Sequence, residues 1–296
     1  MDFLGKSLWI DVGHVAGAQT PPHKYIIQNR SCPLPMTIMK SINAPYMENM
    51  VSIITPAFRV ANIIGETIQS VLDQTYTNWE MLIADDCSPD NTRQIVREWC
   101  ARDERIKLIE LERNGGPAMA RNAALERATG RWIAFLDSDD LWLPNKLERS
   151  IDHAHRTHGA LVFTGFRRIS ANGGVLGRYI GVPSSLSYRQ LLGNTSIATS
   201  TVLIDRSLVG DIRMRKTYYD DFDCWLQVLK KGHMARGLNE DLMRYRVMNA
   251  SVSRNKHRSA KMVWRAYRDL EKLSLPTAAW HFANYAYRCV LKYARH

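Results

Sequence analysis

The sequence lacks the features that mark several large classes of protein. Its longest apolar runs, such as residues 132–136, fall far short of the roughly 18–20 residues that cross a bilayer. Residues 1–20 include Asp2 and Asp11 and do not read as a signal peptide. The five cysteines never form a C-x-x-C spacing, which disfavours a disulfide framework or a zinc site. We therefore expect a cytoplasmic protein without a transmembrane helix.

Two common phosphate-binding loops are also missing. The sequence contains neither G-x-x-x-x-G-K-[ST] nor G-x-G-x-x-G. A bound nucleotide would therefore need another group, such as a metal ion, to hold its phosphates. With 45% hydrophobic and 23% charged residues in 296, the composition is that of a globular protein.

The formal net charge of +11 is unevenly distributed along the chain. Residues 51–243 contain 24 basic and 24 acidic residues, whereas residues 244–296 contain 12 basic and only two acidic ones. The protein is thus a neutral body with a basic tail. Such a tail suits either nucleic acid or the phosphates of a membrane.

Three regions differ in pattern. Residues 1–46 are rich in proline and lack periodicity, so we expect an irregular extension, or a translation start further along at Met36, Met39, Met47 or Met50. Residues 47–250 form the main domain. Residues 251–296 are basic and aromatic, and their spacing predicts two helices with a break at Pro276.

The main domain begins with a regular alternation of strands and helices. Strands are expected over residues 51–55, 81–84, 106–111 and 132–136, with a helix after each. This alternation predicts an α/β fold with a mostly parallel sheet that helices cover on both faces. Further strands at 161–166, 201–204 and 242–247 and a helix at 222–231 are expected to extend the same sheet.

Acidic residues follow two of these strands. Asp85 and Asp86 end the second strand, and Asp137, Asp139 and Asp140 follow the fourth. Taken singly, such acids usually cap helices or face water. Here the carboxyl ends of parallel strands bring both clusters to one crevice, where their repulsion calls for a cation. Oxygen ligands favour Mg²⁺ or Mn²⁺, and a nucleoside diphosphate would complete the metal's shell.

Five motifs carry a resemblance to a known family. They are Val51–Phe58 (VSIITPAF), Ile68–Thr75 (IQSVLDQT), Asp85–Thr92 (DDCSPDNT), Asn114–Asn122 (NGGPAMARN) and Asp137–Asp140 (DSDD). Their order and spacing resemble the family 2 glycosyltransferases. The resemblance implies a GT-A fold, a Rossmann-like sheet flanked by helices, over residues 47–250 with helices following. Segments 141–147, 237–240 and 251–256 look most like enzymes of bacterial teichuronic-acid and exopolysaccharide assembly.

The resemblance also implies roles for individual residues. Asp139, the second acid of the D-x-D element, would bind Mn²⁺ or Mg²⁺, whereas Asp140 either joins it or caps a helix. The nucleotide-sugar would contact Pro56 and Phe58 at its base, Asp86 at its uracil or ribose edge, Asn114 and Gly116 in a loop near the base, Asp137 at its ribose or metal, and Asp220. An ordinary turn is the alternative interpretation for Asn114 and Gly116.

A sugar transfer needs a base to take the proton of the acceptor hydroxyl. The segment Tyr219–Asp223 (YDDFD) matches the family's acidic pair, and Asp221 is our choice for that base. A single base is compatible with inversion at the anomeric carbon, which the resemblance implies; the plainer interpretation of both acids is stabilisation of a helix N-terminus. Many relatives carry a histidine shortly after a Tyr-Arg pair, but here Met248 follows Tyr245-Arg246.

The resemblance thus implies an inverting transferase that moves a sugar from a UDP-sugar to a saccharide acceptor, lipid-linked in cell-surface polysaccharide synthesis. Two other classes stay open: a nucleic-acid-binding protein that uses the tail, and a phosphatase of the D-x-D type. We expect no nucleic-acid partner, because no recognised motif supports one.

Two interpretations of the tail also stay open. One is a helix packed on the main domain, and the other is a helix at an anionic membrane on the cytoplasmic side, with aromatic and basic residues Trp280, Phe282, Tyr285, Tyr287, Arg288, Lys292, Tyr293 and Arg295.

Overall fold

A computed structural model describes residues 46–194, 197–217, 219–248 and 256–294. Of the extension expected over residues 1–46, only Tyr46 falls among them. The strands are β1 (Met47–Ala57), β2 (Trp79–Asp85), β3 (Ile106–Glu110), β4 (Gly130–Phe135), β5 (Leu141–Trp142), β6 (Leu161–Ser170), β7 (Leu176–Ile180), β8 (Ser185–Leu186), β9 (Leu203–Asp205) and β10 (Ala235–Val247).

The helices alternate with these strands in the first half of the chain, as expected. They are α1 (Ile64–Leu72), α2 (Thr92–Cys100), α3 (Pro117–Leu125), α4 (Lys146–Thr157), α5 (Tyr188–Leu192), the 3₁₀ turn η1 (Thr199–Thr201), α6 (Arg206–Val209), α7 (Asp220–Lys230), α8 (Lys256–Arg265), the π-helical turn η3 (Ala266–Leu270) and α9 (Leu275–Ala294). Pro276 is the second residue of α9, where its missing N–H costs nothing, so the expected break between two C-terminal helices is confirmed.

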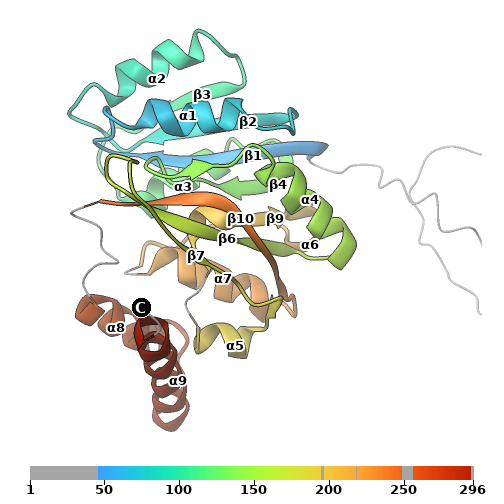
Figure 1. The fold of residues 1–296 in the computed structure, drawn as a ribbon, viewed down its shortest axis with the longest axis vertical. Coiled ribbons are helices and arrows are strands. Elements are labelled where there is room, and N and C mark those ends of the chain that lie inside the picture. The colour runs from blue at the N-terminus through green and yellow to red at the C-terminus, as the bar shows by residue number, and fades with distance from the viewer. Residues whose placement is uncertain (1–45, 195–196, 218, 249–255, 295–296) are drawn as a thin grey trace, which may run out of the picture. The chain divides into compact units, whose positions relative to one another are not determined.

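One mixed sheet runs through the described domain (Figure 1). Its strand order is β3-β2-β1-β4-β9-β6-β10-β5, with β7 paired to β6 and β8 to β10. The first four strands are parallel, and β6 pairs parallel with β10. Between these two groups, β9 runs antiparallel to both β4 and β6. The carboxyl ends of β2, β1 and β4 therefore lie side by side at one edge.

Each face of the sheet is covered by its own layer of helices, because the strands alternate apolar residues between two cores. Along β1, for example, Ile53 belongs to one core and Ile54 to the other. Helices α1, α2 and α4 pack on the first face, and α3, α5 and α7 pack on the second. The C-terminal α8 and α9 join this second layer.

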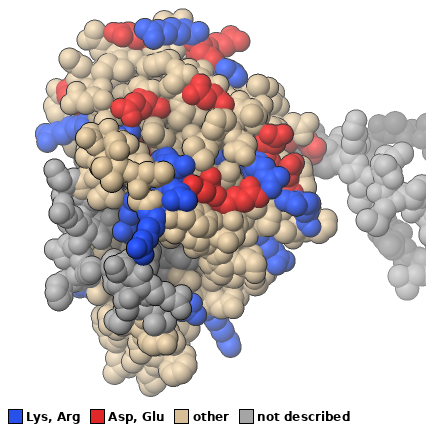
Figure 2. Space-filling view, viewed as in Figure 1, with Lys and Arg blue, Asp and Glu red and all other residues tan. Residues whose placement is uncertain are grey.

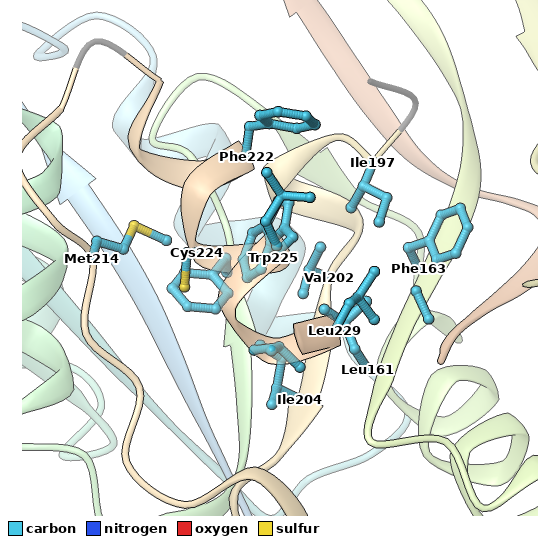
Figure 3. Close-up of a cluster of buried hydrophobic side chains, with 14 of the residues drawn as sticks. Leu161, Phe163, Ile197, Val202, Ile204, Met214, Phe222, Cys224, Trp225 and Leu229 are labelled. Atoms are coloured by element: carbon cyan, nitrogen blue, oxygen red, sulfur yellow. The ribbon is translucent and has the colours of Figure 1, made fainter. Parts of the chain in front are cut away.

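The second core is built around α7 (Figure 3). The indole of Trp225 is 1% exposed and meets the ring of Phe135 edge-on at 5.2 Å between centroids. Residues of β6 and β9, among them Phe163 and Ile204, point into the same cluster. This packing fixes α7, and with it the acidic residues at the start of the helix, against the sheet.

The structure corrects the expected bounds in the second half. β10 begins at Ala235, well before the expected start at Leu242. Four of the added residues are polar or charged, two irregularities interrupt the pairing with β6, and Gly237 lies where a Cβ atom would be 1.8 Å from the Pro183 carbonyl oxygen. A strand with such residues has little sequence signal, because glycine and acidic residues are poor strand formers.

Lys146 is a buried cation in the first core. It is 0% exposed, its Nζ has no hydrogen-bond partner among the described residues, and it lies 3.9 Å from the centroid of the Trp142 ring. Burial lowers the pKa of Lys146 to about 7. The ring face offsets only part of the cost of removing an ammonium from water.

We expect Lys146→Met to stabilise the protein by roughly 1–3 kcal/mol at pH 7, because it removes this desolvation cost at nearly constant volume. The folded pKa lies below the unfolded value of about 10.4, so the unfolded chain binds more protons and wild-type stability rises between pH 7 and 10. The variant should lose this part of the rise in urea unfolding measured across that range.

Lys230→Met serves as the matched control. The Lys230 ammonium lies 2.7 Å from a carboxylate oxygen of Glu271, whose side chain is fully buried. Its removal should destabilise the protein, because an unpaired buried carboxylate remains. A Lys146→Met variant that is less stable than wild type, with an unchanged pH dependence, would contradict the account.

Candidate active site

The predicted site residues come from neighbouring strand ends and from one helix start. Phe58 follows β1, Asp86 follows β2 and Asp139 follows β4, so all three lie at the carboxyl edge of adjacent parallel strands. Asp220 and Asp221 form the first turn of α7. The side chain of Arg121 on α3 contacts Asp137, which follows β4, and Asp220 of α7. It thereby brings the two acidic segments into one site.

Arg121 is a buried cation between two carboxylates. Its Nη2 lies 2.6 Å from Oδ1 of Asp137, its Nη1 lies 3.3 Å from Oδ2 of Asp220, and its side chain is 7% exposed. Burial alone would lower the pKa of Arg121, but the charges of Asp137 and Asp220 outweigh it and raise the pKa. Arg121 therefore stays charged and links the D-x-D turn to the start of α7.

The D-x-D turn is held by Ser200 and Arg246. The Asp137 amide donates to Ser200 Oγ at 3.0 Å, and the same hydroxyl donates to Oδ2 of Asp140 at 2.6 Å. The Arg246 amide donates to Oδ1 of Asp140 at 2.9 Å, and its Nε donates to the Asp139 carbonyl at 2.9 Å. Both carboxylate oxygens of Asp140 are thus used within the protein, which favours a structural role for this residue.

The carboxylate of Asp139 is differently placed. It accepts no hydrogen bond from any other described residue, and it is only partly exposed. Burial and the charge of Asp137 raise the pKa of Asp139 to about 6. A divalent cation bound at Asp139 would offset both the cost of burying its charge and the repulsion from Asp137. No group of three or more His, Cys, Asp or Glu residues placed to hold a metal is found in the described chain, so phosphate and water oxygens would have to supply the other ligands, as Mg²⁺ often requires.

Asp221 is the acid nearest to Thr199. Its Oδ2 accepts a hydrogen bond of 2.7 Å from Thr199 Oγ1, and its Oδ1 accepts one from the amide of Phe222 at 2.7 Å. Burial and the charge of Asp220 raise the pKa of Asp221, while the Thr199 hydroxyl and Arg121 act in the opposite direction. A raised pKa suits a carboxylate that must accept a proton.

The turn η1 contacts both the D-x-D turn and the start of α7. Thr199 binds Asp221, and the next residue, Ser200, binds Asp137 and Asp140. Sequence reasoning missed both hydroxyl residues, and it gave no role to Arg121 or to the Arg246 side chain. The only sequence signal was that both arginines lie inside segments already singled out, Asn114–Asn122 and Tyr245-Arg246.

The expected base-binding residues lie together at the ends of β1 and β2. The carboxylate of Asp86 accepts hydrogen bonds of 2.7 Å from the amides of Gly115 and Gly116, and Asn114 Nδ2 donates to the Asp86 carbonyl at 3.1 Å. Gly116 has a φ of 88°, a backbone conformation that residues other than glycine rarely adopt. Asp86 therefore positions this loop in the structure described here.

The edge of this loop region is apolar. Phe58 is 39% exposed, and the Arg59 guanidinium lies 5.1 Å from the centroid of its ring. Pro56 is partly buried beside it at the end of β1. An exposed ring at this position offers a flat surface on which a base can stack.

The comparisons with known proteins agree with this arrangement. Residues 52–214 match the family model described as Glycosyl transferase family 2. The chain belongs to this family. The match ends at Met214, before the acidic pair of α7.

Curated relatives extend the similarity over most of the chain. One, described as "Putative teichuronic acid biosynthesis glycosyltransferase TuaG" from Bacillus subtilis (strain 168), is 45% identical over 244 residues, which is 82% of this chain and 97% of that protein. Another is the "UDP-Glc:alpha-D-GlcNAc-diphosphoundecaprenol beta-1,3-glucosyltransferase WfgD" of Escherichia coli, 36% identical over 83% of this chain and 95% of that protein. The alternative of a D-x-D phosphatase is thereby set aside.

Solved structures share the fold of this glycosyltransferase. S. aureus TarS 1–349 in complex with UDP-GlcNAc superposes with a TM-score of 0.63 at 20% identity, covering 80% of this chain and 71% of TarS 1–349. Mannosyltransferase PcManGT from Pyrobaculum calidifontis, in complex with GDP-Man and Mn²⁺, gives 0.61 at 18% identity, covering 83% and 75%. The expected GT-A fold is confirmed.

We expect Thr199→Val to shift the acidic limb of the pH profile of sugar transfer to higher pH, by roughly half a unit to one unit. The hydroxyl donates to the charged form of Asp221, so its loss raises the pKa of Asp221 further. Thr199→Ser keeps the hydroxyl and should restore the wild-type profile in kcat measured against pH.

Thr201→Val is the matched control, because Thr201 lies in the same turn and donates its hydroxyl to the Ala198 carbonyl instead. Its acidic limb should coincide with that of the wild type. Identical limbs for Thr199→Val and the wild type would show that the pKa of Asp221 does not set the acidic limb through this hydrogen bond.

Proposed function

We propose that the protein is an inverting, metal-dependent glycosyltransferase that moves a sugar from a UDP-sugar to a lipid-linked saccharide in cell-surface polysaccharide synthesis. The observation that carries the proposal is the pair of differently used carboxylates, Asp139 and Asp221, in one site. Asp139 is left for a cation, and Asp221 is held by Thr199 at the start of α7. The names of the relatives support the donor, the acceptor and the pathway class.

The donor would lie along the strand ends of β1, β2 and β4. Its base would stack near Phe58 beside the loop that Asp86 holds, and its diphosphate would lie towards Asp139. Mn²⁺ or Mg²⁺ bound at Asp139 would neutralise the charge that develops on the leaving diphosphate. Asp137 is bound to Arg121 and orients this side of the site.

The acceptor would enter on the side of α7. Asp221 takes the proton of the attacking hydroxyl. The oxygen of that hydroxyl forms the bond to the anomeric carbon, and the bond from the anomeric carbon to the UDP oxygen breaks. Attack from the face opposite the leaving group inverts the configuration. Asp220, bound to Arg121, lies beside the base and would contact donor or acceptor.

An acceptor of this kind places the reaction at a membrane surface. WfgD, by its name, uses an acceptor linked to diphosphoundecaprenol. We therefore propose that this enzyme works at the cytoplasmic face of the membrane. No helix among the described residues is long and apolar enough to cross a bilayer.

We expect Asp139→Ala and Asp221→Ala each to reduce kcat by at least roughly 100-fold, for different reasons. Asp139→Ala removes the carboxylate left for a cation, so it should also weaken Mn²⁺-dependent binding of UDP by at least roughly tenfold. Asp221→Ala removes the base alone and should leave UDP binding within about twofold of wild type. Calorimetric titration with UDP and product analysis with a polyprenol-diphosphate-linked saccharide measure the two effects.

Asp211→Ala removes a carboxylate that is 91% exposed and outside the site, and should leave both measurements unchanged. Equal loss of UDP binding in both site variants would contradict the division of roles. A product that keeps the donor's anomeric configuration would contradict a single base.

A further inference from the structure

Helix α9 has a packed side and an open side. On the packed side, Ala278 is fully buried and the ring of Phe282 meets Trp264 of α8 edge-on at 5.5 Å. Tyr285 lies beside Phe282, with 5.9 Å between ring centroids. Two aromatic residues that the sequence suggested for a membrane are therefore used inside the protein.

The open side of α9 carries the remaining described aromatic residues. Trp280 is 69% exposed and Tyr287 is 63% exposed. They are seven residues apart, two turns of helix, so they lie on one side, with Ala283 between them and Pro276 one turn before. We call Pro276, Trp280, Ala283 and Tyr287 the α9 outer face. A well-exposed tryptophan and tyrosine aligned on one helix are more than scattered surface apolar residues.

Exposed cations lie on α8, on α9 and on the segment between them. Lys261 of α8, Lys272 before α9 and Arg288 of α9 are exposed. The two acids of the tail are already paired: Asp269 lies 3.2 Å from Arg265, and Glu271 is buried against Lys230. Among the described residues, α8, α9 and the segment between them thus carry exposed cations in addition to the residues of these two ion pairs.

The space-filling view agrees with this distribution. In Figure 2 the described residues at the lower end of the molecule, where Figure 1 places α9, show no red, whereas red side chains gather on the upper part of that face.

We propose that the α9 outer face docks on an anionic membrane surface. Trp280 and Tyr287 would lie at headgroup level, where amphipathic rings are favoured, and the neighbouring lysine and arginine side chains would face lipid phosphates. A second copy of the chain is the other natural occupant of an exposed aromatic face. The exposed cations of α8 and α9 disfavour it, because two basic surfaces repel each other.

This inference extends the proposed function by naming the surface that would meet the membrane. Binding to vesicles requires neither UDP-sugar nor transfer, so either proposal can fail while the other stands. In the full chain, the aromatic anchor can be removed without disturbing the packed side of α9, because Trp280 and Tyr287 are mostly exposed.

The test is co-sedimentation of the full-length protein with phosphatidylcholine vesicles, with and without phosphatidylglycerol. We expect wild type to bind the anionic vesicles more tightly than the neutral ones, and less tightly at high salt. The double variant Trp280→Ser/Tyr287→Ser should bind anionic vesicles at least roughly tenfold more weakly. Its thermal unfolding and its sugar transfer to a soluble acceptor should match wild type.

The control variant Val175→Ser/Leu208→Ser removes two apolar side chains that are 67% and 49% exposed outside α9, and should bind vesicles like wild type. Equal vesicle binding by wild type and the α9 double variant would overturn the proposal. So would a wild-type dimer in light scattering that the α9 variant loses, with no vesicle binding by either, which would assign the α9 outer face to a second copy.

Discussion

Repulsion between carboxylates at one edge of the sheet is the constraint on which the rest of the site depends. Asp137, Asp139 and Asp140 all lie in the turn that follows β4, and α7 adds two more acids. Arg121 and Arg246 are both almost fully buried, and the charges of both arginines act against the raised pKa of Asp139. Loss of a buried cation from such a cluster costs roughly 3–5 kcal/mol, so these arginines support the fold as well as the site.

Contacts within the protein do not use every carboxylate of this cluster. Arg121 binds Asp137 and Asp220, while Ser200 and the Arg246 amide use both oxygens of Asp140. Asp139 is the acid of the turn that no other described side chain neutralises by contact. The same network thus leaves the carboxylate of Asp139 without a hydrogen bond from another described residue and holds Asp221 through η1.

The first half of this fold could be predicted from sequence because its signals are local. Apolar runs define β1 to β4, and acids directly after them mark the carboxyl edge. The second half depends on contacts distant in sequence: Thr199 meets Asp221, and Arg121 reaches Asp220, 99 residues away. β10 was recognised only in part, because Gly237 and its polar neighbours are kept in the strand by pairing and close packing rather than by propensity. The tail was described correctly in composition, but only the packing of α9 shows which aromatic residues face outward.

A crystal structure with UDP and Mn²⁺ tests the central claim most directly, because it shows which acids the charge network leaves for the donor. The account predicts Mn²⁺ bound to Asp139 and to the diphosphate oxygens, with Asp221 still bonded to Thr199 and away from the metal. Mn²⁺ bound by Asp221, or UDP bound away from the ends of β1, β2 and β4, would contradict it.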